Sequence, residues 1–423
     1  MAEMQDFQAL DAVTLPVRLG DNLAMRAALG SDASGWLVRE VGDGNLNLVF
    51  IVEGGKGTVI VKQALPYVRL VGDSWPLPLK RSFFEYHALK RQAERDPGMV
   101  PEILHFDEAQ ALIVMEFLSP HIILRQALIN GQQLPRIGRD LGLFLARTLF
   151  RGSDLSMPTK ARKADLALFA DNAELCDITE NLVFSDPYFD ARMNRHTSPQ
   201  LDGIVAELRA DRDMKVVAQK MKHLFAANAE TLLHGDLHTG SVMVTMDETR
   251  VIDPEFAFYG PMAFDVGMLL ANFWMNFLAQ AGHEQGGSRD SMRAYLLGVI
   301  EQIWSGFTDE FTQLWRTERR GILYETRLFE ERGDALGADQ ALDMVLHDIF
   351  VDALGFAGVE MHRRILGLAH NADFETIADP DLRARCETKA LKLGRHIAVN
   401  RHAIHSIAEV NKLAVRLEKE FVR

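Results

Sequence analysis

Segments typical of β-strands are confined to two parts of this chain of 423 residues. Alternating apolar and polar residues between glycine-rich turns predict strands at 36–40, 46–52 and 58–62, and an apolar run predicts another at 111–117. Valine and isoleucine also flank a tight turn within 231–261, which predicts a β-hairpin. A chain with this pattern can form a small antiparallel sheet followed by a region that contains little β-structure.

Apolar residues elsewhere have the spacing that amphipathic helices require. One helix is predicted beside the first strands, at 82–94, and another follows Pro135 at 137–150. Further helical spacing occurs at 203–228, 289–304, 340–369 and 385–420. We therefore expect an α+β protein in which a small antiparallel sheet with one helix precedes a larger, mainly helical part.

Charge and cysteine content exclude several classes of function. The formal net charge is 46 − 59 = −13, which argues against a nucleic-acid partner or an anionic membrane surface. Cys176 and Cys386 are the only cysteines, too few for a disulfide framework or a structural zinc site. Both observations favour a cytoplasmic protein.

The most apolar stretch, residues 262–280, is interrupted by Asp265, Asn272 and Asn276. A membrane span needs about 20 nearly uninterrupted apolar residues. We therefore expect a buried helix here, and its aromatic residues to belong to the core. The first residues also lack a basic region followed by an apolar run, so no secretory signal is expected.

Two acidic motifs near the predicted hairpin carry the main chemical signal. Asp236 lies in a His-Gly-Asp-Leu-His sequence, and Asp253 lies 253 − 236 = 17 positions later in an Ile-Asp-Pro-Glu sequence. Because Pro254 favours an extended conformation at the residue before it, we expect Asp253 and Glu255 to face the same side and share a cation. Mg²⁺ prefers such oxygen ligands, and phosphoryl transfer uses a carboxylate near the attacking hydroxyl.

The turn that includes Gly44 and Asn45 is a candidate for binding phosphate. Glycines allow backbone N–H groups to approach a phosphate closely, and an asparagine side chain adds a donor. The sequence is neither a Walker A loop nor a complete G-x-G-x-x-G motif. A plain hairpin turn is the alternative interpretation.

Two further features fit a nucleotide site. Lys62 ends a strand rich in valine, and Glu85 lies in the following predicted helix. A lysine in this position can hold the α- and β-phosphates while the glutamate holds the lysine, although two solvated charges without contact are the alternative. The strand edge at 116–118 offers backbone groups to adenine, as any connector does.

These motifs together carry a family resemblance. The strings HGDLHTGS at 234–241, DPEFAFYGPMAFD at 253–265 and DGNLNLVF at 43–50 resemble the aminoglycoside phosphotransferase and choline kinase superfamily, and most closely its 5-methylthioribose kinase family. The resemblance extends over nearly the whole chain. It implies a protein-kinase-like fold with two lobes, nucleotide binding at 1–118, and catalysis and substrate binding at 119–423.

The resemblance also implies an activity and its partners. The expected reaction is phosphorylation of the C1 hydroxyl of 5-methylthioribose by ATP and Mg²⁺, giving 5-methylthioribose 1-phosphate in methionine salvage. The expected assembly is a homodimer. The small-molecule substrate would be the partner, without nucleic acid or membrane.

Individual roles follow from the same resemblance. Asp236 would be the general base, and Asp253 with Glu255 would hold Mg²⁺. The residues that would bind ATP are Gly44, Asn45, Lys62, Glu85, Glu116, Phe117, Leu118, Asp253, Pro254 and Glu255. The residues that would bind the sugar are Asp236, Arg363, Arg364 and Trp75. Because adjacent helical residues point about 100° apart, we expect at most one of the two arginines to be aimed straight at a ligand.

One position departs from the wider superfamily, which has an asparagine metal ligand where this chain has Ser241. Glu255 would supply the missing charged oxygen, which favours the methylthioribose kinase interpretation. Two alternatives stay open at this point. A related kinase could act on an amino alcohol or an aminoglycoside, although the basic pair at Arg363 and Arg364 would repel such cations. The chain could also be an inactive module that binds a nucleotide or a partner.

Overall fold

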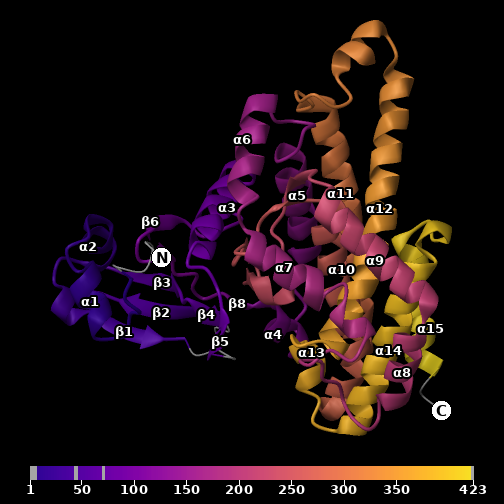
Figure 1. Ribbon diagram of the computed structural model, residues 1–423, viewed down its shortest axis with the longest axis horizontal. Coiled ribbons are helices and arrows are strands. Elements are labelled where there is room, and N and C mark those ends of the chain that lie inside the picture. The colour runs from indigo at the N-terminus through magenta and orange to yellow at the C-terminus, as the bar shows by residue number, and fades with distance from the viewer. Residues whose placement is uncertain (1–6, 42–45, 69–71, 421–423) are drawn as a thin grey trace. The chain divides into compact units, whose positions relative to one another are not determined.

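The structure, a computed structural model, describes residues 7–41, 46–68 and 72–420 (Figure 1). Contacts between residues divide the chain into two compact units. The first unit holds the residues up to His121 together with Asn172–Leu175 and Arg250–Ala257, and the second unit holds the rest. The two predicted acidic motifs therefore belong to different units.

The first unit contains a five-stranded antiparallel sheet in the order β1-β2-β3-β7-β6. Its strands are β1 Leu37–Glu40, β2 Asn47–Glu53, β3 Thr58–Ala64, β7 Leu112–Glu116 and β6 Ile103–Asp107. Successive side chains of a strand point to opposite faces, so that Phe50, Val52, Val59 and Val61 enter one core. Four of these strands are predicted by the sequence; β6 is not, because His105 interrupts its short apolar run.

Helices α1 Thr14–Leu19, α2 Leu23–Leu29 and α3 Arg81–Arg95 also belong to the first unit. Helix α3 is the one predicted at 82–94, and it contacts β3, β6 and β7. Helices α1 and α2 are not predicted, because each is too short to show a helical period. Asn22 caps α2 by accepting hydrogen bonds from the backbone N–H groups of Ala24 and Met25. A two-stranded sheet of β4 Tyr67–Val68 and β5 Gly72–Pro76 precedes α3.

The second unit is mainly helical, as predicted. Its α-helices are α4 Leu124–Ile129, α5 Ile137–Arg151, α6 Thr159–Phe169, α8 Asp202–Ala210, α9 Arg212–Ala227, α10 Met262–Ala279, α11 Asp290–Thr317, α12 Ala335–Leu366, α13 Ala372–Glu375, α14 Pro380–Val399 and α15 Ile407–Glu420, and α7 Ala173–Leu182 enters it from the first unit. Helix α10 is buried along its whole length and contacts α11, α12 and α14. Among the described residues, the segment that starts with α10 is the one long and apolar enough to cross a membrane, and its complete burial is typical of a core helix.

The helical stretch predicted at 385–420 is interrupted. Helix α14 ends at Val399, and α15 begins at Ile407. The side-chain and backbone N–H groups of Asn400 both donate to the carbonyl of His396, so the asparagine satisfies the end of α14 instead of continuing it. The spacing of apolar residues alone does not reveal this break.

The strands predicted to flank the turn within 231–261 are present, as β10 and β11, and further short strands accompany them. Strand β9 Thr231–Leu232 pairs with β12 Tyr259–Gly260, and β10 Val242–Val244 pairs with β8 Ile122–Ile123 and is followed by β11 Thr249–Val251. The loop 233–241 between β9 and β10 carries Asp236. The segment 252–258 between β11 and β12 carries Asp253 and Glu255. Asp236 therefore lies in a loop of the second unit, and Asp253 and Glu255 lie in a segment of the first unit.

Candidate active site

Lys62 lies at the centre of an ionic cluster in the first unit, in which Lys62, Glu85 and Glu255 are buried and Asp253 is exposed. Strand β3 places it between Val49 of β2 and Ile113 of β7. Its Nζ atom lies 2.8 Å from Oε1 of Glu85 on α3 and also contacts Oδ1 of Asp253. The alternative in which Lys62 and Glu85 are separate solvated charges is therefore wrong.

Three carboxylates of this cluster can share a cation. Glu85, Asp253 and Glu255 each offer an oxygen atom, and these atoms lie within 4.8 Å of one another. Carboxylate oxygens are hard ligands of the kind that Mg²⁺ prefers, so the donor set fits that ion. Because Glu85 is already held by Lys62, Asp253 and Glu255 are the better candidates for metal ligands.

Asp253 reaches this position through a conformation that the sequence did not predict. Its φ angle is 70°, in the left-handed region, and not the extended one expected before Pro254. Aspartate tolerates this region better than most residues, and such angles are enriched at functional sites. The i, i+2 geometry of a strand therefore does not explain why Asp253 and Glu255 converge; the turn at Asp253 does.

Two residues of the cluster were missed by the sequence analysis. Asn47 of β2 donates from Nδ2 to Oε2 of Glu255 at 3.0 Å, and Nε of Arg81 lies 3.5 Å from the same oxygen. The fully buried guanidinium of Arg81 also donates to the carbonyls of Leu46 and Leu65. The only signal in the sequence is spacing, because Arg81 precedes Glu85 by four residues and so lies on the same helix face.

Burial and neighbouring charges shift the pKa values of these groups in opposite directions. Burial by itself lowers the pKa of Lys62, but the carboxylates of Asp253, Glu85 and Glu255 raise it above its usual value, so the lysine stays charged. Burial raises the pKa of Glu85 to about 8 and also raises that of Glu255. Lys62 and Arg81 supply two positive charges beside three carboxyl groups, and a divalent cation bound by Asp253 and Glu255 would favour the ionised carboxylates.

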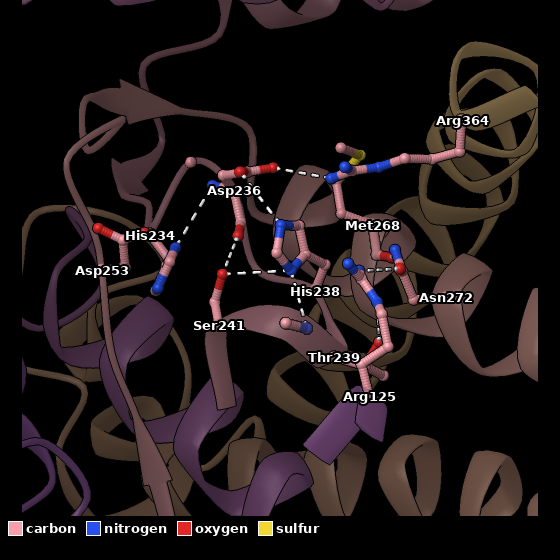
Figure 2. Close-up of polar contacts among 12 residues, drawn as sticks. Arg125, His234, Asp236, His238, Thr239, Ser241, Asp253, Met268, Asn272 and Arg364 are labelled. Carbon is pink, nitrogen blue, oxygen red and sulfur yellow. Dashed lines mark hydrogen bonds and ion pairs between the residues drawn. The ribbon is translucent and has the colours of Figure 1, made fainter. Parts of the chain in front are cut away.

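A second cluster, in the second unit, surrounds Asp236 (Figure 2). Its Oδ1 atom accepts hydrogen bonds from Nη2 of Arg363 at 3.3 Å and from Nη2 of Arg364 at 3.2 Å. Its Oδ2 atom lies 3.3 Å from Nε2 of His238. The Ser241 hydroxyl donates to the backbone carbonyl of Asp236 at 3.0 Å. Ser241 thus supports the loop that carries this carboxylate.

The first turn of α10 holds the loop 233–241 in place. The carboxylate of Asp265 accepts hydrogen bonds from the backbone N–H groups of His234 and Gly235, at 2.6 and 3.1 Å. Gly235 has a φ angle of 85°, which glycine adopts without steric cost. The His-Gly-Asp sequence therefore has a structural basis: glycine permits the turn that presents the next residue, Asp236.

Both arginines converge on Asp236. They lie in the last turn of α12, and both are buried. Their backbone positions do diverge by about 100°, but arginine side chains are long enough to compensate. The direction of the Cα–Cβ bond therefore does not set the direction of the guanidinium.

The protonation states in this cluster follow from its contacts. Burial by itself raises the pKa of Asp236, but the hydrogen bond from His238 and the charges of Arg364 and Arg363 hold it well below its usual value. Burial lowers the pKa of His238 to about 4, so its ring is neutral at pH 7. Because Nδ1 of His238 accepts from the N–H of Gly240 at 3.0 Å, the ring proton resides on Nε2 and is directed at Asp236.

The sequence alone does not reveal the contact between His238 and Asp236. We expect the ring of His238 to keep the neutral Nε2–H form between pH 6 and 8, because its pKa lies at about 4. Long-range ¹H–¹⁵N NMR spectra, with the signal assigned by its loss in His238→Gln, measure this directly. A titration centred near the usual histidine pKa would contradict the tautomer assigned here.

The other predicted residues of the first unit lie in or near its sheet. The backbone N–H of Glu116, at the end of β7, donates to the carbonyl of Glu102 at 2.8 Å, so an adenine contact of Glu116 would use its carbonyl. The remaining positions are the half-buried Phe117 and Trp75 and the buried Leu118 and Pro254. Gly44 and Asn45 lie outside the described residues.

Comparisons with known proteins agree with this geometry. The phosphotransferase enzyme family matches residues 37–295. Methylthioribose kinase of Escherichia coli O45:K1 (strain S88 / ExPEC) is 44% identical over 396 residues, which cover 93% of this chain and 94% of the relative. Methylthioribose kinase 1 of Oryza sativa subsp. japonica is 42% identical over 96% of this chain and 95% of its own length. Methylthioribose kinase of Geobacillus thermodenitrificans (strain NG80-2) is 43% identical over 94% and 95%, respectively.

The chain therefore belongs to the phosphotransferase enzyme family and, within it, groups with the methylthioribose kinases. Membership of this kinase family implies ATP as the phosphoryl donor. The fold class predicted from the sequence is confirmed: a five-stranded antiparallel sheet in an N-terminal part and a large helical C-terminal part.

Proposed function

We propose that this protein is a methylthioribose kinase, which transfers the γ-phosphoryl group of ATP to the C1 hydroxyl of 5-methylthioribose. The product, 5-methylthioribose 1-phosphate, would enter methionine salvage. The observation that carries the proposal is the carboxylate of Asp236, which is ionised, half-buried and held by donors on both oxygens. The choice of acceptor rests on the full-length similarity to methylthioribose kinases.

Asp236 is the proposed general base. One of its oxygens would accept the hydrogen of the C1 hydroxyl and orient that oxygen for in-line attack. A carboxylate with so low a pKa is a weak base, so its main contribution is positioning until late in the transfer, when the hydroxyl becomes acidic. The product 1-phosphate leaves, and the proton passes to solvent.

The cluster around Lys62 is the proposed site for the triphosphate and its metal. Asp253 and Glu255 would hold Mg²⁺, which would neutralise phosphate charge. Lys62, fixed by Glu85, would contact the α- and β-phosphates. Arg81 keeps Glu255 in place from its buried side.

The remaining assignments complete this proposal. The turn with Gly44 and Asn45 would approach the phosphates, and the carbonyl of Glu116 and the N–H of Leu118 would bind adenine. Trp75 would contact the sugar. We assign nucleotide binding to residues 1–118 and catalysis and acceptor binding to residues 119–423, with Mg²⁺ held by the later segment that packs with the first unit.

The alternative acceptors are amino alcohols and aminoglycosides. These substrates are cations, which favour acidic or aromatic surroundings. Arg363 and Arg364 instead direct two guanidiniums to the proposed base, and this favours a neutral polyol. An inactive nucleotide-binding module is disfavoured, because Lys62, Asp236, Asp253 and Glu255 are all present.

A coupled assay of ADP release tests the proposal. The acceptors offered separately would be methylthioribose, choline, homoserine and kanamycin, each with ATP and Mg²⁺. We expect turnover with methylthioribose alone. Turnover confined to choline or kanamycin would replace the proposed acceptor, and no turnover with any acceptor would favour the inactive module.

We further propose that the protein is a cytoplasmic homodimer, as expected from its family resemblance. Light scattering coupled to size-exclusion chromatography measures the mass against the 47.5 kDa of one chain. A monomeric mass at the concentrations used for the assay would contradict the dimer without affecting the proposed reaction.

A further inference from the structure

Glu360 is a fully buried carboxylate without a role in the proposed chemistry. It lies on α12, three and four residues before Arg363 and Arg364. Its Oε2 atom accepts a hydrogen bond from Nε of Arg363 at 2.9 Å, and its Oε1 atom accepts one from Nε of Arg364 at 2.6 Å. One carboxylate therefore holds both arginines, each by a separate oxygen.

Each guanidinium is consequently held by two hydrogen bonds. Its Nε–H binds Glu360, and its Nη2 binds Oδ1 of Asp236. A guanidinium is planar, so two such contacts on one plane determine its position and its orientation. A free arginine side chain would lose rotamer entropy on binding a ligand. Here that ordering has taken place before any ligand arrives.

The charges also balance. Two guanidiniums face two carboxylates, so the group formed by Asp236, Glu360, Arg363 and Arg364 has no net charge. A buried ion pair is retained at low cost only when the remaining donors and acceptors are satisfied. Glu360 meets this condition with a further hydrogen bond, from Nδ2 of Asn272 to Oε1 at 3.3 Å.

Asn272 extends the connection to the catalytic loop. Its Oδ1 accepts from Nη2 of Arg125 at 3.0 Å, and Nε of Arg125 donates to the hydroxyl of Thr239 at 3.1 Å (Figure 2). Thr239 belongs to the same loop, 233–241, as Asp236. Glu360 is thus tied both to the arginines and, through α10, to the loop that carries the proposed base.

We propose that Glu360 is a positioning residue that makes Arg363 and Arg364 a single rigid donor surface for the hydroxyl oxygens of the acceptor. The inference rests on the proposed function, since it concerns how the same site binds its polyol. Within the described part of the chain, the Nη1 groups of both arginines have no hydrogen-bond partner, and they are available to donate to neutral hydroxyls. Loss of Glu360 would release both guanidiniums at once.

The variant Glu360→Gln tests this role with little change of shape. Glutamine has one acceptor oxygen, and its NH₂ group would face the Nε–H of the other arginine. We expect the KM for methylthioribose to rise about tenfold to a hundredfold, the range for losing hydrogen bonds to charged groups. The KM for ATP should stay within about twofold, because the proposed ATP residues do not contact Glu360.

Glu387→Gln is a matched control. Glu387 is another buried carboxylate, on α14, outside this group of four residues. Glu387→Gln reports the general effect of replacing a buried glutamate with glutamine, so the KM of this variant for methylthioribose should equal that of the wild type. A merely structural role of Glu360 would lower the melting temperature and the active fraction without separating the two KM values.

The outcomes are distinguishable. If the wild type does not use methylthioribose, the proposed function fails. If the wild type does use it and Glu360→Gln has the wild-type KM, the inference about Glu360 fails. Should Glu360→Gln not fold, Glu360→Asp takes its place: it keeps the charge but is one methylene shorter, so it draws the guanidiniums away from Asp236 and must raise the KM for methylthioribose. An unchanged value in that variant would also overturn the inference.

Discussion

Replacing Asp236 with asparagine should lower kcat about a thousandfold, the middle of the range for losing a general base. The amide cannot accept the hydroxyl proton, but its oxygen can still accept from Arg363 and Arg364. The arginines should therefore keep their positions, while the site loses the group that accepts the proton. ATP affinity should change little, because the residues proposed to bind ATP belong to the other unit.

Single-turnover measurements of phosphoryl transfer, together with calorimetric titration of ATP, separate these two effects. Asp247→Asn is the control, since Asp247 is an exposed acid in the turn after β10 and its substitution removes the same charge from the same unit. Transfer at the wild-type rate in Asp236→Asn would show that the base has been misassigned. A loss of ATP affinity as large as the loss of kcat would show that Asp236 binds the nucleotide.

The parts of the fold that could be predicted from the sequence are those in which apolar residues recur at a regular spacing. Strands β2 and β3 alternate apolar residues between turns, and α5 and α10 have a helical period long enough to be recognised. The charged pair of Lys62 and Glu85 was also predictable, because one residue ends a strand and the other begins the next helix. Helices α1 and α2 were not, since each has fewer than two full turns of pattern.

The sequence predicted which residues form the site better than it predicted their conformations and contacts. The conformation of Asp253 depends on its surroundings, and only the proline after it was visible in the sequence. Glu360 and Arg81 were missed because a single charged residue in a helical pattern normally indicates an exposed face. Their burial becomes evident only when the partner is known, and the partners of Arg81 are distant in sequence: Asn47 and Glu255.

Glu255→Gln should also lower kcat strongly, but through loss of metal binding and not through loss of the base. The substitution keeps the shape of the side chain and removes one of the carboxylate charges of the Lys62 cluster. With Lys62 and Arg81 still cationic, the cluster has one carboxylate fewer to oppose them, so its affinity for a divalent cation falls. We expect kcat at the Mg²⁺ concentration that saturates the wild type to fall about a hundredfold, comparable to losing one preorganised electrostatic contact.

A second consequence distinguishes loss of a metal ligand from damage to the fold. If Glu255 holds Mg²⁺, higher Mg²⁺ concentrations should restore part of the activity of Glu255→Gln, whereas a misfolded variant would not respond. Glu53→Gln, which changes an exposed acid at the end of β2, is the matched control and should require no additional Mg²⁺. Titrating Mg²⁺ at saturating ATP and acceptor measures the shift. Wild-type activity of Glu255→Gln at every Mg²⁺ concentration would remove Glu255 from the metal site, and Asp253 would then have to bind the ion without it.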